Sequence, residues 1–165
     1  MTIPQNFKFS ASNLQDYLDC PRKFELKYLQ NVEWPAVENE PVLEREHFIA
    51  EGKAFHHAVH KHLIGIPIDK IAPYIKGIDL STWWHNFTSH TPHLWFEGKR
   101  MPEFKVIVAL GDYLFTSQFD LLIQTHENQF IIFDWKTTTS KPNLQFLRKR
   151  IQSRLYPLLL SIIGQ

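Results

Sequence analysis

The chain has 165 residues, 44% of them hydrophobic, and a formal net charge of +1. This length suits one domain with its own core, and the near-neutral charge excludes a uniformly basic protein while leaving room for a local basic patch. The one cysteine, Cys20, excludes an intrachain disulfide, and we expect it to be a small buried residue. The N-terminal residues show no signal-peptide pattern, and the longest apolar run is far shorter than the roughly 20 residues of a membrane span. The sequence therefore favours a cytoplasmic protein with no membrane segment.

The N-terminal part of the chain predicts helices. In residues 10–20, Ser12 followed by Gln15 fits a capping box, and Pro21 predicts the end of that helix and the start of another. A loop is expected over residues 30–41, where two prolines occur.

A long helix is predicted over residues 42–64. Its expected buried stripe is Phe48, Gly52, Phe55, Val59 and Leu63. Because glycine costs about 1 kcal/mol relative to alanine in a helix interior, Gly52 indicates close packing against another segment. We expect His57, His60 and His62 to lie at the surface of this helix.

Residues 66–100 are rich in proline, tryptophan and histidine and predict short helices and loops, one of them capped by Asp79 or Ser81. For the tryptophans Trp83, Trp84 and Trp95, packing in the core is the favoured role. Stacking on unpaired nucleic-acid bases is the alternative.

After Pro102 the pattern changes to three strand-like runs, at 103–110, 113–123 and 129–136. Gly111 and Asp112 suit a two-residue hairpin turn with glycine first, and residues 125–128 suit a second turn. A final helix is predicted over residues 143–163, with a kink at Pro157. Its expected buried face is Leu144, Leu147, Ile151, Leu155 and Leu158.

The two turns set a register for the three strands. Leu110 opposite Tyr113 places Glu103 opposite Asp120, and a second hairpin centred on Glu127 places Asp120 opposite Asp134. The acids then form one row, with Lys136 two residues further on the same face. The other face is almost entirely apolar: Phe104, Val106, Val108, Leu110, Tyr113, Phe115, Phe119, Leu121, Ile131, Phe133 and Trp135, with Ser117 as its small polar member. A one-residue slip would destroy this sorting.

Opposed carboxylates repel one another, and this row has two explanations. A bound Mg²⁺ or Mn²⁺ would remove the repulsion, since both ions prefer hard oxygen ligands. Alternatively, the row is a solvated sheet face with salt bridges to Lys136 and Lys105. Charge alone leaves both open.

These residues resemble the PD-(D/E)XK nuclease superfamily, in its RecB-like and CRISPR-associated exonuclease branch. The resemblance runs in order along nearly the whole chain: the N-terminal helical signature SASNLQDYLDCPRKFELKYL, the Gly-x-x-x-His helix EGKAFHH with His56, the acid-bearing strand PEFKV with Glu103, SQFD with Asp120, DWKTT with Asp134 and Lys136, and the Gln-x-x-x-Tyr helix QSRLY with Gln152 and Tyr156. Any one motif is weak, whereas six in order are specific.

Two positions depart from the family pattern. Ser117 stands where the branch usually has the glycine of Gly-x-x-Asp. Some members hold an iron–sulfur cluster on four cysteines, and Cys20 alone implies no cluster in this chain, unless the natural protein continues past Gln165. The apolar ending LLLSIIGQ leaves such a continuation open, so we expect residues 1–165 to be a single domain that is either whole or truncated at its C-terminus.

The resemblance implies an α/β fold of the restriction-endonuclease type, in which helices flank a central mixed sheet containing an antiparallel three-strand meander. It implies a Mg²⁺- or Mn²⁺-dependent hydrolase of DNA phosphodiester bonds, with exonuclease action in DNA repair, recombination or defence. The resemblance leaves open whether the DNA substrate is single-stranded. The alternatives are an inactive nucleic-acid-binding module and a subunit of a helicase–nuclease complex, and metal binding separates them from the enzyme.

The resemblance also implies roles for individual residues. Asp120 and Asp134 would ligate the metal, with His56 and the backbone carbonyl of Trp135 completing the site. Lys136 would orient the attacking water or stabilise charge on phosphorus. Glu103 would be a further ligand or would position a water.

Residues outside this group keep simpler alternatives. A lone histidine such as His56 is usually a packed residue, and His56 with His60 lacks the glutamate of the zinc motif H-E-x-x-H. Arg148, Gln152 and Tyr156 lie at the i, i+4 and i+8 positions of the last helix, within its basic segment. That face either contacts nucleic-acid phosphates or is a solvated amphipathic surface. The other basic residues of the segment are Lys141, Lys149, Arg150 and Arg154.

Overall fold

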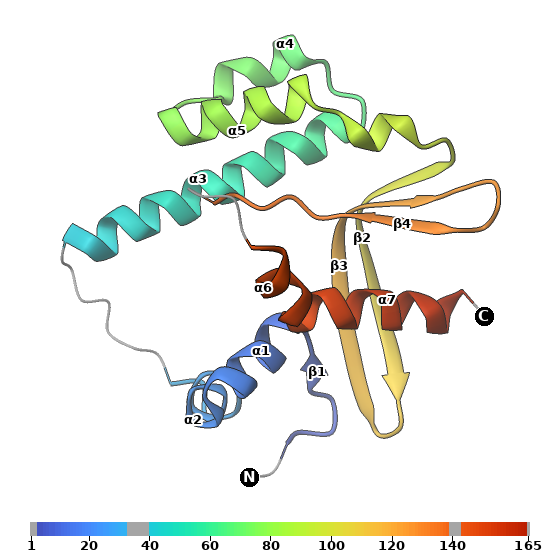
Figure 1. The fold of residues 1–165 in the computed structure, drawn as a ribbon. Coiled ribbons are helices and arrows are strands. Elements are labelled where there is room, and N and C mark those ends of the chain that lie inside the picture. Colours follow the sequence, from blue (N-terminus) through green and yellow to red (C-terminus); the bar gives the residue numbers. More distant parts are fainter. Residues whose placement is uncertain (1–2, 33–39, 139–142, 165) are drawn as a thin grey trace. The chain divides into compact units, whose positions relative to one another are not determined.

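The protein is described by a computed structural model that covers residues 3–32, 40–138 and 143–164 (Figure 1). The fold is of the mixed α/β class that the sequence predicts. Its elements are, in chain order, β1 (Lys8–Phe9), α1 (Ala11–Asp19), α2 (Pro21–Phe24), the π-helical turn η1 (Glu25–Leu29), α3 (Glu40–Leu63), α4 (Ile68–Ile71), the 3₁₀ turn η2 (Ala72–Tyr74), α5 (Ile78–Ser89), the 3₁₀ turn η3 (Pro92–Trp95), β2 (Lys99–Leu110), β3 (Tyr113–Gln124), β4 (Phe130–Phe133), α6 (Leu144–Lys149) and α7 (Ile151–Ile163).

The sheet is mixed, as predicted. The strand order is β1-β3-β2, and β4 also pairs with β3. β1 runs parallel to the start of β3, where Lys8 is opposite Leu114, and β4 runs antiparallel to its end. Gly111 has a φ of 58°, which confirms glycine at the first position of the turn between β2 and β3.

The predicted register of the second hairpin is confirmed over four pairs, from Leu121 opposite Phe133 to Gln124 opposite Phe130. Asp120 opposite Asp134 would be the next pair, one step beyond the end of β4 at Phe133.

In β2 the alternation of faces holds from Lys105 to Ala109, with Val106 and Val108 buried between exposed neighbours. Glu103 has a φ of 51°, in the left-handed region that is typical of a β-bulge rather than of a regular strand. A simple register cannot be carried through this residue, and the opposition of Glu103 and Asp120 stays a prediction.

The chain divides into two compact units, which we describe separately. The first contains the described parts of 1–35, 105–118 and 140–165, and the second those of 36–104 and 119–139. β2 and β3 each contribute residues to both units.

In the first unit, the start of α1 differs from the prediction. Ser10, not Ser12, caps the helix, and it forms the capping box with Asn13. Gln15 has another role, because its Oε1 accepts a hydrogen bond from the backbone amide of Ile151 at the start of α7 (3.2 Å). A side chain of α1 therefore satisfies one of the amides that the first turn of α7 leaves unpaired. Pro21 opens α2, as predicted.

Three further expectations for the first unit are wrong. Cys20 is exposed, because it occupies the extended residue between α1 and α2 instead of a core position. The single helix expected over residues 143–163 is interrupted at Arg150, whose ψ of 141° is not helical, so that α6 and α7 are separate and Pro157 lies inside α7. Of its predicted buried face, Leu155 is buried but Leu144 and Leu158 are exposed, because α7 buries the face on which Leu155 and Leu159 lie one turn apart; Leu160 is also buried.

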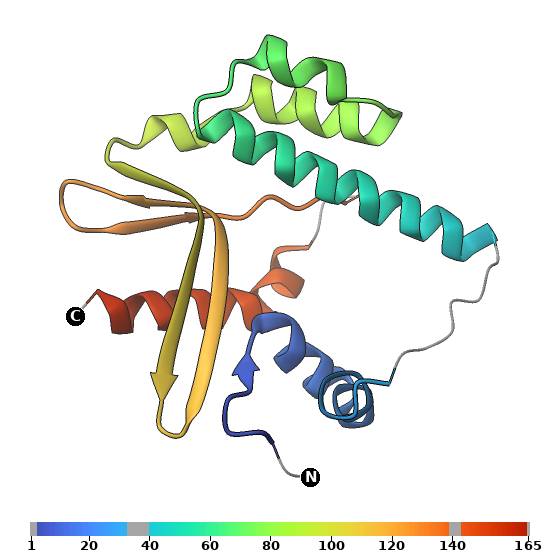
Figure 2. The same cartoon turned by 180° about the vertical axis from the view of Figure 1, so that it is seen from behind.

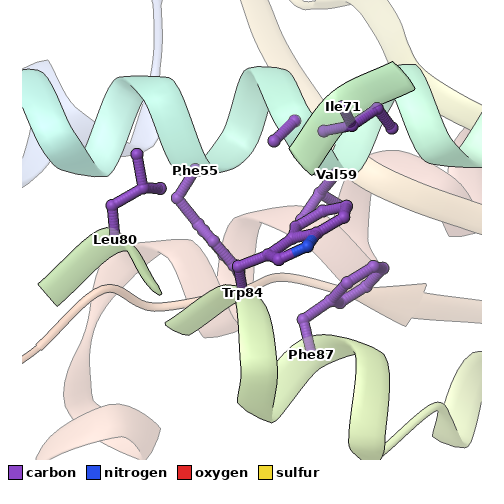
Figure 3. Packing of buried hydrophobic residues seen from close by; sticks show 7 residues of the cluster. Phe55, Val59, Ile71, Leu80, Trp84 and Phe87 are labelled. Atoms are coloured by element: carbon purple, nitrogen blue, oxygen red, sulfur yellow. The ribbon is translucent and has the colours of Figure 1, made fainter. Parts of the chain in front are cut away.

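The second unit is built around α3 and α5, which lie side by side in both views (Figure 1 and Figure 2). Figure 3 shows how apolar side chains from α3, α4 and α5 meet in one cluster. Its buried members are Phe55, Ala58, Val59, Ile71, Leu80, Trp84 and Phe87. Because Phe55 is buried in this cluster, the rotation of α3 about its axis is fixed. The direction of His56, the next residue, is fixed with it.

Two predictions for the second unit are wrong, and the core packing expected for three tryptophans holds for two of them. α5 begins after Gly77 and is not capped by Asp79 or Ser81, because both lie inside the helix. His62 is not a surface residue: its Nδ1 is buried and its ring packs edge-on against Trp84 and Phe87. Trp84 lies in the core and Trp83 packs against it, whereas Trp95 is 78% exposed.

Candidate active site

The predicted acids Asp120 and Asp134 lie at the ends of two paired segments in the second unit. Asp120 is on β3 between Phe119 and Leu121, both fully buried, so the backbone that carries its carboxylate is held in the core. Asp134 follows the last residue of β4. The two side chains are 17% and 25% exposed, so both can reach a ligand from solvent.

Asp120 connects three segments of this unit. Its Oδ1 lies 3.2 Å from Nδ1 of His56 on α3, and its Oδ2 accepts a hydrogen bond from the backbone amide of Trp135 (2.8 Å). A carboxylate has about four acceptor sites, so these two contacts leave room for further ligands on the same group. The structure therefore brings His56 and the Trp135 amide to Asp120, whereas the ligand expected from Trp135 was its carbonyl.

The pKa of His56 is raised above its ordinary value. The hydrogen bond with Asp120 is the largest cause, burial opposes it, and the charges of Asp120, Asp134 and Glu103 add to it. All three predicted acids thus act on one imidazole. Glu103 therefore interacts electrostatically with His56, whichever residue of β3 it lies opposite.

Lys136 forms an ion pair with Asp134, with Nζ 2.5 Å from Oδ2. The two residues belong to the irregular segment that follows β4, and the lysine side chain is 42% exposed. The salt bridge expected for a solvated sheet face is therefore present. It is equally the arrangement that keeps an ammonium group next to a metal-binding carboxylate, so it does not separate the two explanations.

A divalent cation fits this group by donor chemistry. Asp120 and Asp134 offer hard carboxylate oxygens and His56 offers an imidazole nitrogen, a set that Mg²⁺ or Mn²⁺ accepts. As arranged, no three His, Cys, Asp or Glu side chains in residues 3–32, 40–138 and 143–164 are grouped closely enough to hold an ion. Lys136 instead supplies a positive charge beside Asp134, and His56 supplies one beside Asp120 when its imidazole is protonated.

Gly52 explains how α3 comes close to the segment after Lys136. A Cβ atom at this position would lie 2.9 Å from Oγ1 of Thr137, so any larger residue would force the Thr137 side chain or the helix to shift. The predicted close packing of Gly52 is confirmed, and its partner is the residue that follows the predicted catalytic lysine.

A pocket of about 480 Å³ opens beside His56. It is lined by Phe48, Ile49, Gly52, Lys53, His56 and Thr137. Sequence reasoning placed Phe48 only in a buried stripe and passed over Ile49 and Lys53. The available signal was their spacing, because the five α3 residues recur on one helix face.

The predicted nucleic-acid-binding residues belong to the first unit. Gln152 and Tyr156 are both on α7, but Arg148 is on α6, so the continuous stripe predicted for the three residues is wrong. The interruption at Arg150 removes the helical spacing on which it depended.

Tyr156 has a contact that the sequence did not indicate. Its hydroxyl donates a hydrogen bond to the carbonyl of Gln118 on β3 (2.9 Å). Tyr156 also borders a second pocket, of about 290 Å³. The other residues lining it are Ser10, Ala11, Ser12, Lys105, Thr116, Ser117 and Gln118.

Some predicted features lie outside the described residues, namely most of the loop expected over residues 30–41 and the basic residue Lys141. Within the described residues, no helix has the length and apolar character needed to cross a membrane.

Comparison with known families gives one result for the whole arrangement. The family described as the PD-(D/E)XK nuclease superfamily matches residues 8–163. This range includes every residue of the candidate site. Searches of curated proteins and of solved structures find no match to the chain.

Proposed function

The chain belongs to the PD-(D/E)XK nuclease superfamily, and on this basis we propose that it is a divalent-metal-dependent nuclease that hydrolyses DNA phosphodiester bonds. The observation that carries the proposal is the contact of Asp120 with both His56 and the amide of Trp135, next to the Asp134–Lys136 pair. Nucleases of this superfamily typically use divalent metal ions, and the donor set of Asp120, Asp134 and His56 suits Mg²⁺ or Mn²⁺.

Asp120 and Asp134 would hold the ion, with His56 and the Trp135 carbonyl as further ligands. Such an ion, when bound, polarises the scissile phosphate and lowers the pKa of the attacking water. The Trp135 amide fixes the orientation of the Asp120 carboxylate, and α3 fixes His56 against it. A carboxylate held in this way loses little conformational entropy when it binds a ligand.

Lys136 has the chemistry to act on the substrate directly. Its ammonium lies beside Asp134 and is partly exposed, so it can donate a hydrogen bond to a phosphate oxygen or to the attacking water. Glu103, whose charge reaches His56, would position a water or serve as another ligand.

We assign the protein to the RecB-like branch and to exonuclease action in repair, recombination or defence. The order of six motifs along one chain supports this assignment. Arg148, Gln152 and Tyr156 would contact the DNA backbone, and the exposed Lys149, Arg150 and Arg154 add positive charge to the same segment. The whole arrangement acts as a single nuclease domain, alone or as the nuclease subunit of a larger helicase complex.

The test is a nuclease assay on single- and double-stranded DNA with Mg²⁺ or Mn²⁺, with and without EDTA, for the wild type and for Asp134→Asn. We expect hydrolysis that EDTA abolishes and that Asp134→Asn lowers at least about 100-fold. Calorimetry with Mn²⁺ on the same two proteins gives a second measurement, independent of activity. If the wild type binds no metal and cleaves no DNA, the enzyme proposal is wrong. DNA binding without cleavage would then favour a non-catalytic binding module.

A further inference from the structure

The pocket beside His56 has a definite chemical character. Two of its walls are apolar, from Phe48 and Ile49, and one edge carries the cation of Lys53. Phe48 is half-buried, and Ile49 is 46% exposed. A surface with an exposed isoleucine beside a lysine offers both a place for a flat apolar group and a partner for an anion.

The aromatic wall is held in place before any ligand binds. The Phe48 ring packs edge-on against Trp83, with centroids 5.2 Å apart, and Trp83 packs in the same way on Phe55 of the core cluster (6.2 Å). Because this chain of rings ends in the core, Phe48 has little freedom to collapse into the pocket. A preformed wall lowers the entropy lost when a ligand binds.

The pocket is continuous with the candidate active site. His56 lines the pocket, and its Nδ1 contacts Asp120. Thr137, which also lines the pocket, follows Lys136 directly in the chain. From Phe48 to His56 the helix rises about 12 Å, at about 1.5 Å per residue, so the pocket extends along α3 away from His56, the residue that contacts Asp120.

We propose that this pocket binds one unpaired nucleobase of single-stranded DNA, on the nucleotide next to the scissile phosphate. The base lies against Phe48 and Ile49, and Lys53 contacts the phosphate of that nucleotide. The inference rests on the proposed nuclease function and specifies its substrate as an unpaired DNA end.

Two physical arguments select an unpaired base as the occupant. The faces of a base in a duplex are covered by its stacking neighbours, so a base must leave the stack before an apolar wall can cover it. Stacking on protein side chains is tolerant of sequence and contributes a large part of single-strand binding. Single-strand binding sites combine such a wall with positive charge that contacts the phosphate backbone, and here a lysine supplies that charge.

The base contact is tested by fluorescence anisotropy with a short labelled oligothymidylate, using Ca²⁺ in place of Mg²⁺ to limit hydrolysis. We expect Phe48→Ala to weaken binding about 5–100-fold, the range of one lost stacking contact. Ile49→Ala, which leaves the Phe48–Trp83 contact intact, should weaken it in the same direction. Leu43→Ala removes a similarly exposed side chain of α3 outside the pocket and should have no effect. A thermal melt of each variant confirms folding.

A mutant cycle locates the base. A series of oligonucleotides is used, each lacking the base at a different position. For one of these positions, loss of the base should weaken wild-type binding as much as Phe48→Ala weakens binding of the intact oligonucleotide. At that position the two changes should not add, because each removes the same contact. Additive effects at every position, or unchanged binding by Phe48→Ala and Ile49→Ala, would overturn the proposal.

Lys53→Ala tests the phosphate contact. The slope of log affinity against log salt concentration should become less steep by about 0.7, the value for one phosphate on a single strand. Lys70→Ala, an exposed lysine of α4 outside the pocket, should leave the slope unchanged. An unchanged slope in Lys53→Ala would remove Lys53 from the site. If metal-dependent cleavage persists while all pocket variants bind like the wild type, only this inference fails; absence of cleavage in the wild type is instead the failure of the proposed function.

Discussion

Nδ1 of His56 lies 3.2 Å from Oδ1 of Asp120, and this contact joins helix α3 to strand β3 at the residue that also accepts the Trp135 amide. Asp120 is thus the residue through which the candidate site is assembled. We therefore expect Asp120→Asn to weaken Mn²⁺ binding by at least about 100-fold, because a neutral amide is a poorer metal ligand than a charged carboxylate. Calorimetry measures this change. Asp112→Asn, in the exposed turn, is the matched control, and equal Mn²⁺ affinity in both variants would contradict the role of Asp120.

Lys136 should separate catalysis from metal binding. Lys136→Ala removes the ammonium beside Asp134 but no proposed ligand, so we expect hydrolysis to fall about 100–1000-fold with Mn²⁺ affinity retained. Single-turnover cleavage and calorimetry on the same protein measure the two quantities. Lys76→Ala, an exposed lysine elsewhere, should cleave like the wild type. Loss of Mn²⁺ binding in Lys136→Ala would show that the lysine serves to orient Asp134.

Tyr156 should contribute to stability through its hydrogen bond to the Gln118 carbonyl. Tyr156→Phe deletes only the hydroxyl, and we expect the free energy of unfolding to fall by about 1 kcal/mol. Denaturant unfolding measures it, with Tyr113→Phe, an exposed tyrosine of the same unit, as the control. Unchanged stability would contradict this role of the hydroxyl, and a lower DNA affinity in the same variant would then leave only the DNA contact proposed for Tyr156.

His93 predicts a loss of stability in mild acid. It is 1% exposed, neither ring nitrogen has a hydrogen-bond partner among the described residues, and its ring stacks on Phe87 (5.4 Å). Burial is the main reason why its pKa is lowered from 6.5, and the positive charges of Arg100 and His62 add to it.

The sign of the effect follows from proton binding. Below pH 6.5 the unfolded chain takes up a proton on this histidine that the folded chain does not, so stability falls with pH from that value down to the lowered folded pKa. The slope is at most about 1.4 kcal/mol per pH unit. His93→Leu should flatten the profile of urea midpoints between about pH 7.5 and pH 5, whereas His85→Leu, at an exposed site, should not. Identical slopes in wild type and His93→Leu would rule out this origin.

Asp16, in the first unit, makes stability fall with pH in a more acidic range. The hydrogen bond from Lys23 is the main cause that lowers its pKa to about 2, and Lys27 and Tyr28 also donate to it. Its stabilisation is complete above the unfolded value of 3.8 and is lost as pH falls towards 2. Asp16→Asn should therefore lower the melting temperature at neutral pH, with a difference that shrinks in acid. Asp69→Asn, an exposed aspartate, is the control; a constant difference at all pH values would contradict the assignment.

Much of the sheet was predictable because strand patterns are local. Gly111 needs a turn with positive φ, and the alternation of Val106 and Val108 with exposed residues marks one face of β2. The same reasoning fixed the β3–β4 register that places Leu121 opposite Phe133. It did not foresee the left-handed conformation of Glu103, since a bulge leaves no reliable mark in a single sequence.

Helix ends were less predictable because several residues compete to cap them. Ser10 and Ser12 are both good capping residues, and only the observed bond to Asn13 selects Ser10. The interruption at Arg150 coincides with the bond from the Ile151 amide to Gln15, a residue of another helix. Sequence-based reasoning about one helix cannot include such a partner.

The sequence by itself determined the chemistry that is available: the order of the motifs, the two aspartates on neighbouring strand-like runs, and the lysine two residues after the second aspartate. Periodicity and turn propensity act over a few residues, so they are legible in a single chain. Only the tertiary structure decided which groups meet. The contact of Asp120 with His56, the approach of Gly52 to Thr137 and the pocket beside them depend on packing between segments distant in the sequence, where side-chain shape and burial, not local pattern, select the partners.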